Sequence, residues 1–244
     1  MKNSYLFTTL VFGIAFSGLV MGQSPAQYQN VVNKTAAQVH AGYPKTAFCR
    51  FAYNSRFEID MPGASFLTPK QRKVSWMTIV PLSRVGKDLA CYHSRCQWQK
   101  RVLSGPVCCT LRNARYKKIE GDLHNRLPVV PMLKQWRGDR EFGKVSRQHE
   151  TGECGVLRDD KVIEPPDSFK GTVGRAYLYL HDLYDIGLTD SERELFTKWH
   201  QTYPPESWEK TWDMQIGIKQ GKHNPYIYRG KENRRQGEQV SFKK

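Results

Sequence analysis

Six cysteines, all between residues 49 and 154, limit the folds open to this chain more than any other feature of its sequence. They are Cys49, Cys91, Cys96, Cys108, Cys109 and Cys154. An even number of cysteines in an exported chain predicts disulfides, although the pairing cannot be read from the sequence. Because Cys108 and Cys109 are adjacent, we expect each to pair with a cysteine elsewhere. The competing interpretation is a zinc site, but Cys91 and Cys96 lack a second pair at zinc-finger spacing.

The N-terminal segment predicts export. Lys2 precedes an apolar run from Leu6 to Val20 that carries no charge, and Gly22 follows shortly after it. These features are typical of a secretory signal peptide, and we expect cleavage before Gln23. The alternative is an uncleaved membrane anchor, for which the run is short. We therefore predict a signal peptide at residues 1–22 and a soluble mature protein that is secreted or periplasmic.

The rest of the chain predicts one basic domain. We place the domain at residues 23–228, long enough to bury a core, and a basic flexible tail at 229–244. The formal net charge is +15, which favours binding to polyanions: nucleic acid, lipopolysaccharide, acidic glycans or anionic lipid. Charge alone does not choose among these partners, and charge kept for solubility is a further explanation. We expect a monomer.

Apolar periodicity predicts three helices in the C-terminal third. Apolar residues recur at helical spacing between Val173 and Tyr184. A capping box at 189–192 begins the second helix, which buries Trp199. The third helix carries Trp208 and Trp212 on one face and ends at Gly221. Their aromatic stripes are typical of a core rather than of a binding surface.

The N-terminal half predicts strands and loops. Alternating residues predict strands around residues 48–53 and at 74–80, where Pro81 ends the second strand. We expect at most one short helix in 23–45, an irregular disulfide-tied region at 83–119, and mostly loop at 126–170. Together these elements predict an α+β fold.

One short cluster carries groups suited to chemistry. Asp122, His124 and Asn125 place an acid, a histidine and an amide within four residues. Such groups can bind a hard metal ion and polarise a phosphate. A turn of the Asx type explains Asp122 or Asn125 equally well.

The residues around this cluster resemble the bacterial endonuclease I family. The resemblance runs from about residue 74 to 227, in matching order and spacing. Its motifs are Glu120-Gly121-Asp122-Leu123-His124-Asn125, Pro128, Gly138-Asp139-Arg140, Phe142-Gly143, Gly152-Glu153-Cys154, Glu164-Pro165-Pro166, Lys170-Gly171, Gly174 to Tyr179, Trp199, Tyr203-Pro204, Trp208-Glu209 and Gln220 to Tyr226.

This resemblance implies a fold and a function. The family is secreted or periplasmic and cleaves DNA, often RNA too, with little sequence preference. Its ββα-metal (His-Me finger) site lies on a mixed α/β body, a small sheet plus several helices, tied by disulfides. A histidine activates water, while a glutamate and an asparagine hold Mg²⁺. Asn125 matches that asparagine.

The chain departs from the family where the glutamate and histidine are expected. The matching strand is Trp76–Pro81, where the family has Trp-Glu-His-Val-Val-Pro and this chain has Met77 and Thr78. A threonine hydroxyl cannot take a proton from water near neutral pH, and losing a general base costs on the order of 10²–10⁴-fold in rate. A methionine thioether is a poor ligand for hard Mg²⁺. We therefore expect no intact catalytic pair.

Other residues are candidates to replace the missing groups. His93, in the cysteine-rich region, and His124 are candidate bases, although His124 is expected to face away from Asn125. Glu120 and Asp122 are candidate metal ligands beside Asn125. Mg²⁺ is expected only if the protein is an active enzyme.

Several polar residues are candidates for contacting nucleic acid. Two flank the start of a predicted helix, where an N-terminus favours phosphate. The alternative for each is an ordinary solvated surface residue. The set is Arg140, Lys170, Arg175, Lys222, His223 and Asn224.

Three hypotheses follow for function. The first is an exported endonuclease I-like protein that binds DNA or RNA and whose nuclease activity is lost or strongly reduced by Met77 and Thr78. The second is a working metal-dependent, non-specific endonuclease with a rearranged base. The third is a secreted interaction module for a protein, glycan or membrane partner.

Overall fold

The structure, a computed structural model, describes residues 23–61, 63 and 68–228. The predicted signal peptide at 1–22 and the predicted basic tail at 229–244 lie outside the described residues. No helix within the described ranges is long and apolar enough to cross a membrane.

Helices form nearly half of the described chain, and the strands are short. The α-helices are α1 (Pro25–Val39), α2 (Leu82–Gly86), α3 (Ala90–His93), α4 (Pro106–Arg112), α5 (Ala114–Glu120), α6 (Pro131–Arg137), α7 (Asp167–Tyr184), α8 (Asp190–Thr202), α9 (Ser207–Gln220) and α10 (Pro225–Tyr228). Two single 3-10 turns are η1 (Leu123–Asn125) and η2 (Glu153–Gly155). The strands are β1 (Ser75–Thr78), β2 (Arg95–Trp98), β3 (Arg101–Ser104), β4 (Arg126–Val129), β5 (Glu141–Phe142), β6 (Glu150–Thr151), β7 (Leu157–Arg158) and β8 (Val162–Glu164).

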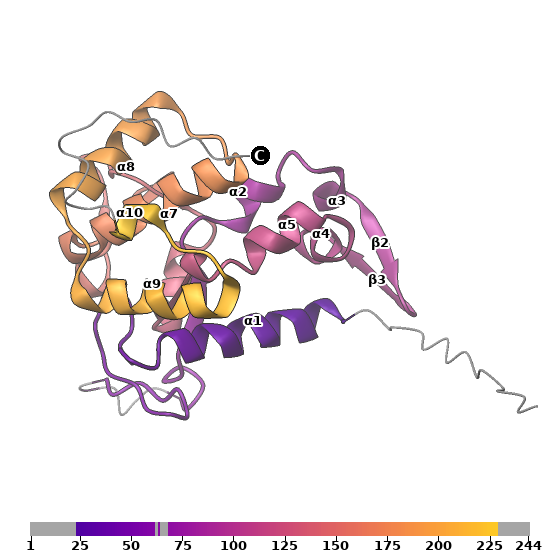
Figure 1. Cartoon of the computed structure of the whole chain (residues 1–244), viewed down its shortest axis with the longest axis horizontal. Coiled ribbons are helices and arrows are strands. Elements are labelled where there is room, and N and C mark those ends of the chain that lie inside the picture. Colours follow the sequence, from indigo (N-terminus) through magenta and orange to yellow (C-terminus); the bar gives the residue numbers. More distant parts are fainter. Residues whose placement is uncertain (1–22, 62, 64–67, 229–244) are drawn as a thin grey trace, which may run out of the picture.

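The three predicted C-terminal helices are confirmed, and they form the body of the molecule (Figure 1). Helix α7 packs against α8, where the Tyr177 and Phe196 rings stack with 4.1 Å between their centroids. The capping box at Thr189 begins α8, and Gly221 ends α9 in the left-handed region with φ +70°. Because glycine has no Cβ, it adopts the left-handed conformation at little cost in energy, which explains why α9 ends there.

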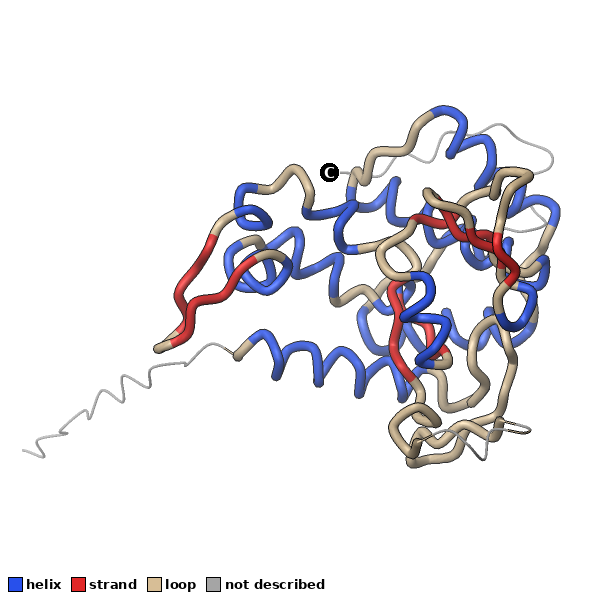
Figure 2. The backbone as a smooth tube through the Cα atoms, turned by 180° about the vertical axis from the view of Figure 1, so that it is seen from behind, coloured by secondary structure: helices blue, strands red, loops and turns tan. Residues whose placement is uncertain are grey.

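Strands β1 and β4 and helix α6 form a ββα unit. The two strands are antiparallel and pair Met77 with Leu127 and Thr78 with Arg126. Helix α6 follows β4 almost at once and packs on β1. The remaining strands form a β2–β3 hairpin and a small four-stranded sheet in the order β5-β8-β7-β6 (Figure 2). The predicted α+β fold is thus confirmed.

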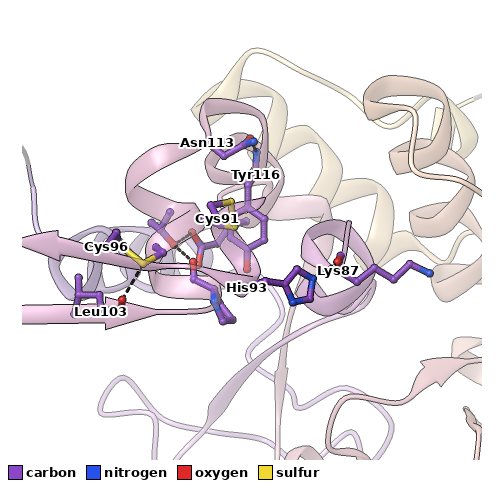
Figure 3. Close-up of a disulfide and its surroundings, with 12 residues drawn as sticks. Lys87, Cys91, His93, Cys96, Leu103, Asn113 and Tyr116 are labelled. Carbon is purple, nitrogen blue, oxygen red and sulfur yellow. Dashed lines mark hydrogen bonds between the residues drawn. A yellow bond between two sulfur atoms is a disulfide. The ribbon is translucent and has the colours of Figure 1, made fainter. Parts of the chain in front are cut away.

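All six cysteines form disulfides, which removes the zinc interpretation. The pairs are Cys49–Cys154, Cys91–Cys109 and Cys96–Cys108. The expectation that the adjacent cysteines pair elsewhere is confirmed. Cys109 ties α4 to α3 and Cys108 ties α4 to β2, so the projecting β2–β3 hairpin is fixed to the helices at its base (Figures 1 and 3).

Several local predictions were wrong. Residues 83–119 are not irregular, since they hold α2 to α5 and the β2–β3 hairpin, and 126–170 holds strands, η2 and α6. These elements are too short for apolar periodicity to detect, and contacts distant in sequence hold them. The predicted strand around 48–53 contributes only isolated bridges such as Lys45 to Ala52. Helix α1 spans 15 residues, and its Ser24 to Gln27 capping box is the signal that was missed.

Candidate functional site

The candidate site is a cavity of about 280 Å³ at the end of strand β1. Residues from α1, β1, α5, β4 and α6 line it, so the ββα unit forms a large part of its wall. The lining residues that carry polar groups of interest are Thr78, Glu120, Arg126, Lys134, Arg137 and Asp139.

The pleat of β1 separates the two positions where the chain departs from the family pattern. Side chains alternate between the faces of a strand, and cross-strand partners share a face. Thr78 is partly exposed and lies opposite Arg126, whereas Met77 is 3% exposed, pairs with Leu127 and joins the hydrophobic core. Met77 also contributes to the cavity wall. The cavity therefore presents a hydroxyl at Thr78 and apolar surface at Met77.

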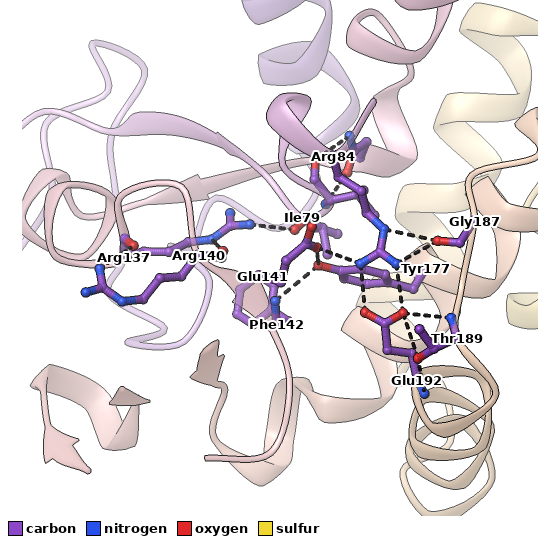
Figure 4. A network of polar contacts seen from close by, with 12 residues as sticks. Ile79, Arg84, Arg137, Arg140, Glu141, Phe142, Tyr177, Gly187, Thr189 and Glu192 are labelled. Atoms are coloured by element: carbon purple, nitrogen blue, oxygen red, sulfur yellow. Dashed lines mark hydrogen bonds and ion pairs between the residues drawn. The ribbon is translucent and has the colours of Figure 1, made fainter. Parts of the chain in front are cut away.

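Three cationic side chains surround Thr78. Lys134 donates from Nζ to the carbonyl of Trp76 at 2.7 Å. Arg137 is buried and donates to the carbonyls of Thr78 and Ile79, the latter at 2.8 Å (Figure 4). Burial lowers the pKa of Lys134, and the nearby charges of Arg126 and Arg137 lower it further. The end of β1 is therefore a strongly positive environment.

The carboxylates of the cavity differ in exposure. Glu120 is 4% exposed and accepts hydrogen bonds from Thr110 Oγ1 at 2.8 Å and from Gln29. Burial raises the pKa of Glu120, which disfavours its charged form. Asp139 lies exposed just beyond the C-terminus of α6.

Asn125 is fully buried, and its amide is used by the protein itself. Its Oδ1 accepts the Val80 N–H at 2.7 Å, and its Nδ2 donates to the Val80 carbonyl at 3.1 Å. Asn125 is absent from the residues that line the cavity. The predicted metal-ligand role does not fit this geometry, because the amide instead fixes the backbone where β1 ends.

His124 and Asp122 belong to a buried polar network on the other side of η1. His124 is fully buried, and its Nε2 lies 2.7 Å from Asp213 Oδ1. Burial opposes the charged imidazole, but the hydrogen bonds to Asp122 and Asp213 outweigh it and raise the pKa of His124. Because His124 is buried, lies outside the lining of the cavity and has its Nε2 bound to Asp213, it does not suit the role of substitute base.

Asp122 is likewise committed to structure. Its Oδ2 accepts the hydroxyls of Tyr179 at 3.0 Å and Tyr184 at 2.8 Å. Its Oδ1 accepts the backbone N–H of His124 at 2.9 Å, the Asx-type turn that the sequence offered as an alternative to metal binding.

The structure does not bring His93 to the cavity. His93 lies at the C-terminus of α3, is exposed, and has its Nε2 within hydrogen-bond distance of the Lys87 carbonyl (Figure 3). Among the described residues, the lining of the cavity includes no histidine. His93 is therefore not placed to act as a base beside Thr78.

Two of the predicted nucleic-acid contacts are buried, which corrects that prediction. Arg175 is 2% exposed and binds Glu209 through Nε at 2.7 Å and Nη2 at 2.6 Å. Asn224 is also 2% exposed and donates to the Arg175 carbonyl at 3.2 Å. Both residues hold α7, α9 and the start of α10 together and are not available to a ligand.

The other four predicted contacts are spread over the surface. Lys170 is paired with Glu164 at 2.7 Å and with Asp167 at 2.8 Å. Arg140 lines a separate cavity of about 540 Å³. Lys222 and His223 are exposed and line a third cavity, of about 190 Å³. None of the four lines the cavity at Thr78.

Sequence reasoning missed Arg126, Lys134 and Arg137. Arg126 directly follows Asn125 and pairs with Thr78 across the strands, a position that only the register reveals. Lys134 and Arg137 are three residues apart on α6, so they share a helix face. Their spacing was a usable signal, but residues 126–170 were expected to be mostly loop.

The magnesium ion that the resemblance implies does not fit these residues. Asn125 is held by Val80, Met77 offers a buried thioether, and a dication would meet three cationic side chains. No group of three or more histidine, cysteine, aspartate or glutamate side chains in the described ranges is arranged to hold a metal ion.

A ββα unit on a disulfide-tied α+β body defines an endonuclease I-like fold. Comparison with known families gives the same result: the family model described as Endonuclease I matches residues 47–231, and the chain belongs to that family. The resemblance found in the sequence is thereby confirmed.

Curated relatives are named as nucleases. The chain is 28% identical over 243 residues to "Endonuclease-1" of Buchnera aphidicola subsp. Baizongia pistaciae (strain Bp), covering 93% of this chain and 94% of the relative. It is 28% identical to the "Periplasmic deoxyribonuclease" of Aeromonas hydrophila, covering 83% of this chain and 86% of the relative. An "Extracellular deoxyribonuclease" of the same organism is 28% identical, covering 83% and 89%.

Proposed function

We propose that this protein is an exported member of the endonuclease I family that binds DNA or RNA and has lost nearly all of its nuclease activity. The observation that carries the proposal is the cavity at Thr78. Its described lining offers a hydroxyl where the family pattern has a histidine, and no other histidine reaches it.

The chemistry of the cavity opposes hydrolysis. Activating water requires a group that accepts a proton near neutral pH, and removing such a base costs on the order of 10²–10⁴-fold in rate. The buried Glu120 is engaged by Thr110 and Gln29, and Thr78 has no basic atom. No group of three or more metal-ligating side chains in the described part of the chain is arranged to hold the ion that usually stabilises charge building on the phosphate.

The same features support binding. The net charge of +15 attracts polyanions, and the cavity concentrates cationic groups in one place. The relatives are named deoxyribonucleases and endonucleases, which makes nucleic acid the polyanion we propose. The words periplasmic and extracellular in those names support export, together with the disulfides and the predicted signal peptide at 1–22.

A plasmid assay tests the loss of activity. The mature protein, incubated with supercoiled plasmid and either Mg²⁺ or Mn²⁺, is expected to retard the plasmid in a gel without nicking it above a no-protein control. Nicking that is robust and disappears with EDTA would overturn the proposal.

A working nuclease with a rearranged base is the second candidate, and Asp139 is the observation that favours it. Asp139 is an exposed carboxylate at the cavity. If nicking is found, Asp139→Asn should abolish it, whereas His93→Ala should not, because His93 lies outside the cavity. Nicking that survives Asp139→Asn removes this candidate.

A further inference from the structure

The cations at the end of β1 lack carboxylate partners. Within the described residues, Arg126, Lys134 and Arg137 form no ion pair, whereas Arg84 and Lys170 elsewhere in the protein each bind two carboxylates. Glu120 and Asp139 also line the cavity, but neither forms an ion pair with these cations, so an anion bound among them would be favourable. The cavity is therefore built for a negatively charged ligand.

Backbone carbonyls hold two of these cations in place. Lys134 and Arg137 lie on one face of α6, and they donate to the carbonyls of Trp76, Thr78 and Ile79 at the end of β1. The Arg137 guanidinium also lies over the Phe142 ring, 4.6 Å from its centroid. Neutral carbonyls orient these groups without cancelling their charge.

Arg126 supplies an observation that points to a ligand. It is 5% exposed, and its Nη2 donates to the Glu120 carbonyl at 2.9 Å. Its buried Nε has no hydrogen-bond partner in the described part of the chain. Buried polar groups are normally paired, so the guanidinium of Arg126, beside the cavity, is incompletely satisfied by the described part of the protein.

The charges that line the cavity favour an anion over a metal ion as its ligand. A divalent cation would meet three positive side chains and only two carboxylates, one of which is engaged by Thr110 and Gln29. A phosphate oxygen would meet the ammonium group of Lys134, while the buried guanidinium groups of Arg126 and Arg137 add positive charge nearby.

We propose that the cavity at Thr78 binds a backbone phosphate of DNA or RNA without a metal ion, the positive charge being supplied by Arg126, Lys134 and Arg137. This inference rests on the proposed function and adds that nucleic-acid binding by this family member does not depend on Mg²⁺.

Binding of a short fluorescein-labelled DNA strand to the mature protein, followed by anisotropy at matched ionic strength, tests the absence of a metal. The Kd is expected to be the same in EDTA and in Mg²⁺, within about twofold. Binding that is at least tenfold weaker in EDTA would overturn the inference.

Two exposed lysines provide a matched pair of variants. Lys134→Gln removes a cavity charge and Lys198→Gln removes one from the surface of α8, with the same change in net charge. Lys134→Gln is expected to weaken binding about tenfold, the usual effect of losing a charge-assisted hydrogen bond, and to make the slope of log K against log salt concentration shallower. Asp139→Asn is expected to strengthen binding. Equal effects of the two lysine variants would refute the cavity as the phosphate site.

A titration with inorganic phosphate tests the anion site in the cavity separately from nucleic-acid binding by the whole protein. In a nitrogen-15 NMR titration without metal, phosphate is expected to shift the amides of Thr78 and Arg126 and to do so less in Lys134→Gln. Unshifted amides contradict the inference even if DNA binds elsewhere. Shifted amides with no DNA binding would leave the cavity as an anion site and refute the proposed function.

Discussion

The side chain of Asn125 and the backbone of Val80 form a two-way contact that fixes where strand β1 ends. At the level of single residues, this contact gives Asn125 a structural role in place of the metal-binding role that the resemblance implies. With Met77 in the core and Asn125 bound to backbone, the residues that the resemblance assigns to magnesium have structural roles instead. The chemistry of the site is left to Thr78 and the cations around it.

Asn125→Ala is therefore expected to act on stability. It leaves the N–H and the carbonyl of Val80 buried without partners, at a cost of about 2–3 kcal/mol. Urea unfolding followed by tryptophan fluorescence measures the change. Asn30→Ala, on the exposed face of α1, is the control and should alter stability by less than about 0.5 kcal/mol. Equal effects of the two variants would contradict the structural role of Asn125.

Restoring the family residues is not expected to restore the family chemistry. In the Met77→Glu/Thr78→His double variant, the new carboxylate would lie at a position that is 3% exposed, and three cations would still repel Mg²⁺. We expect no EDTA-sensitive nicking of plasmid by this variant in Mg²⁺. Clear nicking would show that Met77 and Thr78 alone separate this chain from an active nuclease.

At the level of elements, the sequence predicted what depends on local signals. The capping box that begins at Thr189 and the glycine at Gly221 lie at the ends of the helices they delimit, so α8 and α9 were found. The β2–β3 hairpin has strands of four residues and owes its position to Cys96–Cys108, a contact that no local pattern reveals.

The same limit applied to the candidate site: the sequence revealed its local features but not the contacts between distant segments. Thr78 was found because it breaks a family motif at one position of one strand. Arg126 and Arg137 come from β4 and α6, and they meet Thr78 only through the register of β1 with β4 and the packing of α6 on β1. A sequence without its strand register cannot show that three cations converge.

The disulfides should differ in their effect on stability. Cys49–Cys154 links residues 105 apart, and Cys96–Cys108 links residues only 12 apart. Because a longer closed loop restricts the unfolded chain more, replacing the first pair with alanine should cost about 2 kcal/mol more than replacing the second. Guanidinium unfolding of the two double variants measures the difference. A larger loss for Cys96 and Cys108 would show that the hairpin contributes more to folding than its loop length implies.

At the level of the whole molecule, the paired and unpaired cations have different roles. Arg84 joins α2 to α8 through Glu192 and also contacts Glu141 (Figure 4). Arg175 joins α7 to α9 through Glu209. These ion pairs hold helices together, so the two arginines are already neutralised within the protein. The net charge of +15 counts paired and unpaired cations alike. Only the cations without carboxylate partners are free to meet an external anion.

The dependence of binding on salt follows from this distinction. Each phosphate neutralised on a single strand contributes a slope of about −0.7 to log K against log salt concentration, so the one phosphate proposed for the cavity predicts a slope of about −0.7 or steeper. Anisotropy titrations of the mature protein at several salt concentrations measure it, and the protein with Lys134→Gln should give a shallower slope. A slope near zero would instead favour the secreted interaction module, because a protein or uncharged glycan partner releases few counterions when it binds.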